Sequence, residues 1–149
     1  MLKEKKYRAE CEVFDAYLSK AGIRKSVQRY NIMKVFLDAR HHITVADLLE
    51  LVKKRYPSIG TATVYRTIRL FCDAGIAQEV DIGDGVIRYE HKLGHEHHDH
   101  LVCNECGIFI ETKDDRIEKL QEELAEKHGF SPLSHRLQIF GICKKCSEN

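Results

Sequence analysis

The sequence has no tryptophan, only two prolines and nine glycines in 149 residues. So little proline and glycine excludes collagen-like and proline-rich low-complexity chains. No apolar run approaches the roughly 20 residues that a helix needs to cross a bilayer. The charged start MLKEKKYRAE lacks the apolar segment of a signal peptide. We therefore expect a cytoplasmic protein with no membrane partner, in a compartment where clustered cysteines bind metal more often than they form disulfides.

The chain also lacks an excess of charge of either sign, with 24 Lys+Arg against 23 Asp+Glu and a net charge of +1. The sum hides an asymmetry, because residues 1–90 carry 16 basic and 12 acidic residues, or +4, and residues 91–149 carry 8 and 11, or −3. Seven of the nine His and four of the six Cys lie from position 91 onward. This distribution predicts a basic domain over residues 1–90, a hinge over 91–94 and a domain rich in metal ligands over 95–149.

Helical periodicity predicts four helices in the N-terminal domain. They are expected over residues 10–21, from Ser26, from Thr44 and over residues 62–74. Ser26 is a suitable N-cap, and Thr44 forms a capping box with Asp47, in which Asp replaces the usual Glu. Gly75 ends the fourth helix as its C′ residue.

The pattern then changes to an alternation of apolar and polar residues. Residues 76–82 and 86–90 predict two strands around the turn Gly83-Asp84-Gly85, so the N-terminal domain is expected to be a winged helix-turn-helix. The helix before such a wing enters the DNA major groove, and nearby cations neutralise phosphate. Basic residues on a helix are more often merely solvated, and Tyr65 could instead pack in the core. The DNA-binding candidates are Arg24, Lys25, Arg29, Thr61, Thr63, Tyr65, Arg66 and Arg69.

Two CxxC motifs lie in the C-terminal domain, with 36 residues between them. Each motif brings two thiolates to one ion, and a pair of motifs completes a tetrahedral zinc site that is typically structural. The alternative is two separate redox pairs, but a thioredoxin-like CxxC opens a helix after a strand, which the flanking sequence does not favour. We therefore expect one structural Zn(II) on Cys103, Cys106, Cys143 and Cys146.

The segment HEHHDH, residues 95–100, leads into the apolar strand Leu101-Val102-Cys103. Strand alternation places His98 and His100 on one face, and His97 and Asp99 on the other. One segment can thus contribute nitrogen and oxygen ligands to two metal sites. The alternative is a weak, solvated chelator.

The rest of the C-terminal half predicts a strand over residues 108–111, an amphipathic helix over 114–128 and a strand over 134–140. The expected fold class is α+β, a winged helix followed by a small C-terminal α/β dimerisation domain with an antiparallel sheet. Such a small sheet leaves edges exposed, and a second copy would cover them. Helix-turn-helix modules also commonly dimerise to read two half-sites, so we expect a homodimer.

Five motifs in this order and spacing resemble the ferric uptake regulator family: AGIRKSVQR, HHITVADLL, GTATVYRTIRLFCDAGI, HEHHDHLVCNECG and CKKC. The resemblance covers roughly residues 10–146. It implies a dimeric, metal-activated repressor of metal-uptake genes that binds an AT-rich palindrome of double-stranded DNA and has no small-molecule substrate.

The resemblance also implies which residues bind metal. The structural zinc falls on the four cysteines named above. The regulatory site falls on His42, Glu90, His98, His100 and Glu111. An additional site falls on His97, Asp99, Glu118 and His135. The residue pattern alone nominates neither His42 nor Glu90.

A five-ligand site without thiolate suits Fe(II), with Mn(II), Zn(II) or Co(II) as substitutes. Peroxide sensors of the family place Asp where this chain has Glu111, and zinc sensors recruit a thiolate at positions that Cys11 and Cys72 do not occupy. Iron sensing is therefore favoured over peroxide, manganese or zinc sensing, and Cys11 and Cys72 are expected to be inert.

Two other classes of protein would require different features of the sequence. A zinc enzyme would need an open metal position and a general base, and no HExxH or HxE…PCxxC motif is present, so no enzyme is expected. A metal-buffering protein would need the ligands but not the winged helix.

Overall fold

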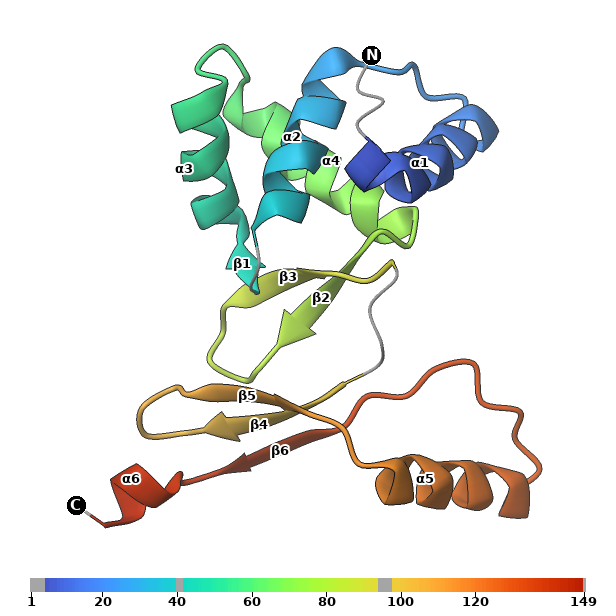
Figure 1. Ribbon diagram of the computed structural model, residues 1–149, viewed down its shortest axis with the longest axis vertical. Helices are drawn as coiled ribbons and strands as arrows, with labels where there is room; N and C mark the ends of the chain where they lie inside the picture. Colours follow the sequence, from blue (N-terminus) through green and yellow to red (C-terminus); the bar gives the residue numbers. More distant parts are fainter. Residues whose placement is uncertain (1–4, 40–41, 94–97, 149) are drawn as a thin grey trace. The chain divides into compact units, whose positions relative to one another are not determined.

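The computed structural model describes residues 5–39, 42–93 and 98–148. The chain forms two compact units, Met1–His95 and Glu96–Asn149 (Figure 1). None of the described helices is both long and apolar enough to cross a membrane. Each unit is described by itself below.

The N-terminal unit consists of helices packed around one core and a small sheet beside them (Figure 1). Its helices are η1 (Lys5–Tyr7), α1 (Arg8–Lys20), α2 (Val27–Asp38), α3 (Val45–Arg55) and α4 (Thr61–Asp73). Phe14, Phe36 and Phe71, from α1, α2 and α4, meet in the core with ring-centroid distances of 5.1 and 5.9 Å. Burial of these rings fixes α4, the helix before the wing, against the two helices that precede it.

The helix ends largely follow the sequence signals. Thr44 and Asp47 form the expected capping box, with the Asp47 N–H donating to Thr44 Oγ1 over 3.1 Å. Gly75 follows α4 with a φ of 74°, as a C′ glycine requires. Ser26 is the N-cap of α2, but its side chain makes no capping hydrogen bond, so that part of the expectation is wrong.

The sheet of this unit has three strands rather than the two expected. Strands β2 (Ala77–Asp81) and β3 (Ile87–His91) form the hairpin, and β1 (Ile43–Thr44) pairs antiparallel with β3 on its other edge. The wing turn is held by Asp84, which accepts two bonds from the Arg88 guanidinium at 3.0 and 2.7 Å. The resulting order β1-β3-β2 completes a winged helix.

The C-terminal unit contains β4 (Asp99–Cys103), β5 (Phe109–Thr112), α5 (Asp115–Lys127), β6 (Gln138–Gly141) and the short α6 (Lys144–Ser147). Its sheet has the order β5-β4-β6. The β4–β5 pair is antiparallel, but β6 runs parallel to β4, so the expectation of a wholly antiparallel sheet is wrong. A long connection that includes α5 carries the chain back to the start of the sheet, and such crossovers produce parallel pairs.

The C-terminal unit buries little apolar surface by itself. Helix α5 has no buried residue, and Leu120 and Leu124 are 63% and 60% exposed. Ile139 and Phe140 on β6 are also about half exposed. An exposed apolar surface of this kind is typical of an interface.

Candidate metal centres and DNA-binding surface

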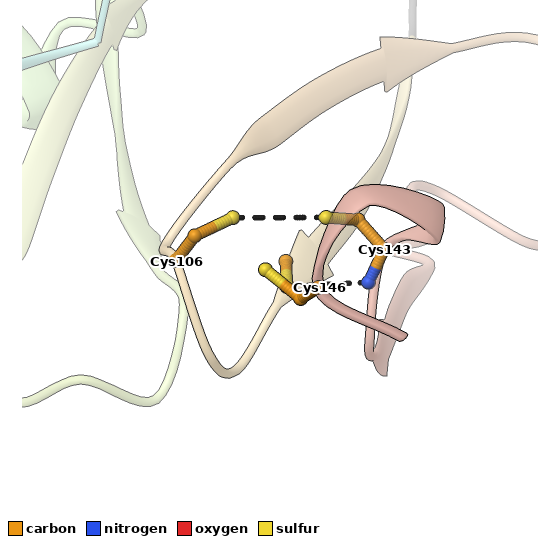
Figure 2. A group of neighbouring side chains, drawn as sticks. Cys106, Cys143 and Cys146 are labelled. Carbon is orange, nitrogen blue, oxygen red and sulfur yellow. Dashed lines mark hydrogen bonds between the residues drawn. The ribbon is translucent and has the colours of Figure 1, made fainter. Parts of the chain in front are cut away.

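The two CxxC motifs meet in the C-terminal unit. Figure 2 shows Cys106, from the turn after β4, facing Cys143 at the N-cap of α6 across a Sγ–Sγ distance of 3.7 Å. All four sulfurs, including those of Cys103 and Cys146, lie within 4.8 Å of one another. Zinc–sulfur bonds of about 2.3 Å in a tetrahedron place the sulfurs about 3.8 Å apart, so the spacing fits one zinc. It does not fit a disulfide, whose sulfurs are about 2.05 Å apart.

Backbone hydrogen bonds and crowding of the sulfurs shift the pKa values of the four-cysteine group. The Cys143 N–H donates to Cys103 Sγ over 3.2 Å. Backbone N–H groups of Cys106 and Cys143 lower the pKa of Cys103 to about 6. The neighbouring sulfurs of Cys106 and Cys143 raise the pKa of Cys146 to about 12. Four crowded thiols cannot all ionise without a positive charge among them, which a bound Zn(II) supplies.

A second donor group lies in the N-terminal unit. Ile43 on β1 pairs with Tyr89 on β3, and the same antiparallel register sets His42 opposite Glu90. The His42 Nε2 contacts Glu90 Oε2, and Gln78 Nε2 donates to Glu90 Oε1. The His42 and Glu90 side chains are both about nine-tenths buried. The structure thus places an imidazole beside a carboxylate near the end of β3, where β1 and the wing meet.

A third donor group lies on one face of the β4–β5 pair. His100 is directly opposite Glu111 in the antiparallel register. The His98 Nε2 lies 3.9 Å from Glu111 Oε1, and the His98 and His100 rings are 5.1 Å apart. The alternation predicted for this segment therefore holds for His98 and His100, which share a side with a carboxylate.

Asp99 belongs to a separate group in the C-terminal unit. Its carboxylate gathers with Glu118 of α5 and His135, with one ligand atom of each within 4.8 Å of the others. His135 Nε2 lies 3.2 Å from Glu118 Oε2. His135 precedes β6 rather than lying in it, so the strand predicted from residue 134 begins later. His97, the fourth predicted ligand, lies outside the described residues.

The predicted DNA-binding residues of α4 lie on its outer face. Thr61, Tyr65, Arg66 and Arg69 are exposed and Thr63 is half-buried, whereas Val64, Thr67, Ile68 and Phe71 are buried. Tyr65 is 44% exposed, which excludes the core alternative. Arg24 and Lys25 are exposed in the segment before α2, and Arg29 is half-buried in its first turn.

The comparisons with known proteins agree with this architecture. A sequence model described as the ferric uptake regulator family matches residues 20–140. This chain belongs to the ferric uptake regulator family. A ferric uptake regulation protein of Rhizobium leguminosarum bv. viciae is 41% identical over 81% of this chain and 84% of its own. A peroxide-responsive repressor of Staphylococcus epidermidis is 31% identical over 93% and 91%. The solved structure of the Helicobacter pylori ferric uptake regulator superposes with a TM-score of 0.79, at 27% identity, over 93% of this chain and 92% of that one.

Members of this family are metal-responsive transcriptional regulators and not enzymes. They bind DNA and are dimers. Family membership therefore accounts for one feature of each unit. The N-terminal unit is a basic winged helix, and the C-terminal unit has an uncovered apolar surface. The expected fold of a winged helix with a C-terminal dimerisation domain is confirmed.

Sequence reasoning missed several parts of the sites. Residue pattern alone gave no reason to select His42, because β1 has only two residues and therefore no periodicity. It also missed Gln78, whose amide donates to Glu90, and α6, which forms the second CxxC turn. Burial raises the pKa of Cys11 and raises that of Cys72 to about 11, so both thiols stay protonated at neutral pH, in line with the expectation that they are inert.

Proposed function

We propose that this regulator represses metal-uptake genes when Fe(II) is abundant, by binding an AT-rich palindromic operator as a homodimer. The observation that carries this proposal is that each unit separately gathers imidazole and carboxylate groups without thiolate. These are His42 with Glu90 in one unit, and His98, His100 and Glu111 in the other. They occupy the positions of the regulatory site that the family resemblance implies.

We further propose that both donor groups bind the same cation. They lie on either side of the hinge in the sequence, so a shared ion would restrict the freedom of one unit relative to the other. If only a fraction of the molecules has the arrangement that can bind DNA, the apparent DNA affinity is reduced by that fraction. A metal that binds this arrangement more tightly raises the fraction and restores the DNA affinity. Nitrogen and oxygen donors suit Fe(II), and also accept Mn(II), Co(II) and Zn(II). Because Fe(II) is low in the affinity order, selectivity must come from metal availability in the cell.

The two other groups have different proposed roles. The four cysteines would hold a closed, structural Zn(II) that joins the β4–β5 turn to the C-terminal α6. Asp99, Glu118 and His135, with His97, would hold an additional cation that ties β4 to α5 and the segment before β6. Neither set leaves a role for a reacting substrate.

Peroxide sensing is the second candidate, because one relative is a peroxide-responsive repressor that matches 93% of this chain. Glu111 argues against it, since the resemblance implies Asp at this position in peroxide sensors. The two functions separate in one assay, in which Fe(II)-loaded protein is exposed to hydrogen peroxide. An iron sensor keeps its regulatory histidines unmodified by mass spectrometry, and a peroxide sensor gains oxygen on them.

The proposal is tested by operator binding of anaerobically purified protein that retains zinc but lacks regulatory metal. Added Fe(II) should tighten binding at least tenfold, and Mn(II) should substitute for it. His98→Ala should lose this response while keeping the zinc content. His128→Ala is the matched control, because His128 is exposed at the end of α5 and belongs to none of the groups. Equal affinity with and without metal in the unmodified protein would refute the proposal.

A further inference from the structure

The segment between α1 and α2 contains two cations, Arg24 and Lys25, which are not equally available to a phosphate. Lys25 Nζ lies 2.6 Å from Asp15 Oδ2, an acceptor on α1. The Lys25 side chain is 51% exposed and that of Asp15 is 37% exposed. An ammonium paired this closely with a carboxylate carries little net charge towards a phosphate, and the carboxylate itself repels one.

Asp15 is itself fixed by a second partner. The Tyr30 hydroxyl, from the first half of α2, donates to Asp15 Oδ1. Burial opposes ionisation of Asp15, but the bonds from Lys25 and Tyr30 outweigh it and lower the pKa of Asp15. One carboxylate on α1 thus binds both the segment before α2 and α2 itself.

Ring contacts in the core connect Tyr30 to α4. The Tyr30 ring packs edge-on against Phe14 at 5.9 Å, and Phe14 packs edge-on against Phe71 of α4 at 5.1 Å. Packed aromatic rings in a protein core are close to incompressible, so they keep the elements that carry them in a fixed spacing. The segment around Lys25 is therefore held in register with α4.

The neighbouring Arg24 differs from Lys25. It is exposed, and no acidic group among the described residues lies within ion-pair distance of its guanidinium. Its main chain is held in place, because the Arg29 guanidinium donates to the Arg24 carbonyl. Of the two cations in this segment, Lys25 is paired with a carboxylate, and Arg24 is the one whose charge remains available.

We infer that Asp15 is a positioning residue for DNA binding, and that Lys25 is its internal counter-ion rather than a phosphate contact. The Lys25–Asp15–Tyr30 contacts hold residues 23–26 so that Arg24 meets the DNA together with α4. This inference rests on the proposed DNA-binding function. It replaces the expectation from sequence that Lys25 binds phosphate.

The first test measures how operator affinity of the metal-loaded, full-length protein depends on salt. Each phosphate-contacting cation contributes a slope of about −0.9 to log K against log salt. Arg24→Met should reduce the slope by about this amount, and adding Lys25→Met to Arg24→Met should leave the slope unchanged. A further reduction of about 0.9 on adding Lys25→Met would overturn the inference.

The second test concerns Asp15→Asn, with Glu12→Gln as the matched control. Glu12 is exposed on the same helix and loses the same charge. Removing a negative charge raises affinity for all DNA, so the readout is the ratio of operator to non-specific affinity. We expect Asp15→Asn to lower this ratio on the order of two- to fivefold, as the loss of a partly exposed ion pair permits, and Glu12→Gln to leave it unchanged. An unchanged ratio in Asp15→Asn would overturn the inference.

A third measurement does not depend on DNA. Amide hydrogen exchange of residues 23–26 should accelerate severalfold in Asp15→Asn and in Lys25→Met. The double variant that carries both substitutions should exchange no faster than either single variant. Unchanged exchange would contradict the positioning role. If the unmodified protein shows no metal-dependent operator binding, the proposed function fails, and this exchange measurement still decides whether Asp15 holds the segment.

Discussion

Asp38, the last residue of α2, joins three elements of the N-terminal unit and is the best place to test its stability. It accepts from Lys6 Nζ at 3.1 Å, from Arg55 at 3.0 Å and from the Tyr7 hydroxyl. These donors come from η1 and from α3, so one carboxylate binds the start of the chain and the end of α3 to α2. Asp38→Asn keeps the shape and removes the charge.

The size of the effect follows from the pKa of Asp38. Burial opposes its ionisation, but the bonds from Tyr7, Arg55 and Lys6 outweigh this and lower the pKa from an ordinary 3.8 to about 2. Each pKa unit corresponds to about 1.4 kcal/mol, so the full difference is worth about 2.5 kcal/mol. Because Asp38 is 29% exposed and Arg55 is 50% exposed, solvent screening reduces the expected loss in Asp38→Asn to about 1 kcal/mol.

The chain provides a selective probe of this unit. All six tyrosines lie between positions 7 and 89, and there is no tryptophan, so intrinsic tyrosine fluorescence reports on the N-terminal unit alone. In urea at pH 7 the unfolding midpoint of Asp38→Asn should fall by about 0.3–1 M. The control Glu12→Gln removes a carboxylate whose ion pair with Arg8 is exposed, and its midpoint should not change measurably.

The pH dependence provides a second check on Asp38. Its pKa is lower in the folded than in the unfolded chain, so its contribution is fully present above the ordinary pKa of 3.8 and is lost as the pH falls towards 2. The difference in urea midpoint between the unmodified protein and Asp38→Asn should therefore become smaller as the pH falls from 3.8 towards 2. Equal midpoints for Asp38→Asn and the unmodified protein at pH 7 would show that the bonds to the Asp38 carboxylate do not stabilise the N-terminal unit.

Three further predictions concern the core, the zinc site and the dimer. Thr67 is 1% exposed, and its hydroxyl has no hydrogen-bond partner in the described part of the chain. Thr67→Val should therefore stabilise the N-terminal unit by about 1 kcal/mol in the same urea assay, and destabilisation would contradict this. Cys146→Ser should lose about one zinc per chain by elemental analysis, while Cys72→Ser keeps it. Leu124→Glu places a charge on the uncovered face of α5 and should yield monomers in sedimentation at micromolar concentration, whereas the control Glu122→Gln should remain dimeric. A Leu124→Glu protein that stays dimeric would exclude this face from the interface.

Local sequence signals predicted the elements that have their own periodicity or caps. The capping box at Thr44, the C′ glycine after α4 and the wing hairpin all follow from short-range chemistry, and the structure has them. The shared face of His98 and His100 follows in the same way from the alternation of side chains along a strand.

Features that depend on distant partners were not predictable from the residues. Strand β1 exists because Ile43 and Thr44 pair with β3, and a two-residue strand carries no pattern of its own. For that reason the neighbourhood of His42 and Glu90 was accessible only through resemblance to the family. The parallel placement of β6 likewise depends on the crossover that contains α5, which sequence alternation does not encode.

The proposed switch requires that regulatory metal and operator DNA bind with mutual coupling. Thermodynamic linkage requires that if metal tightens operator binding by a given factor, the operator tightens metal binding by the same factor. The affinity of zinc-retaining protein for Mn(II), as an air-stable probe, should be measured by titration calorimetry with and without saturating operator. Mn(II) should bind at least tenfold more tightly to the operator complex than to the free protein. Equal Mn(II) affinity in the presence and absence of operator would exclude the coupling.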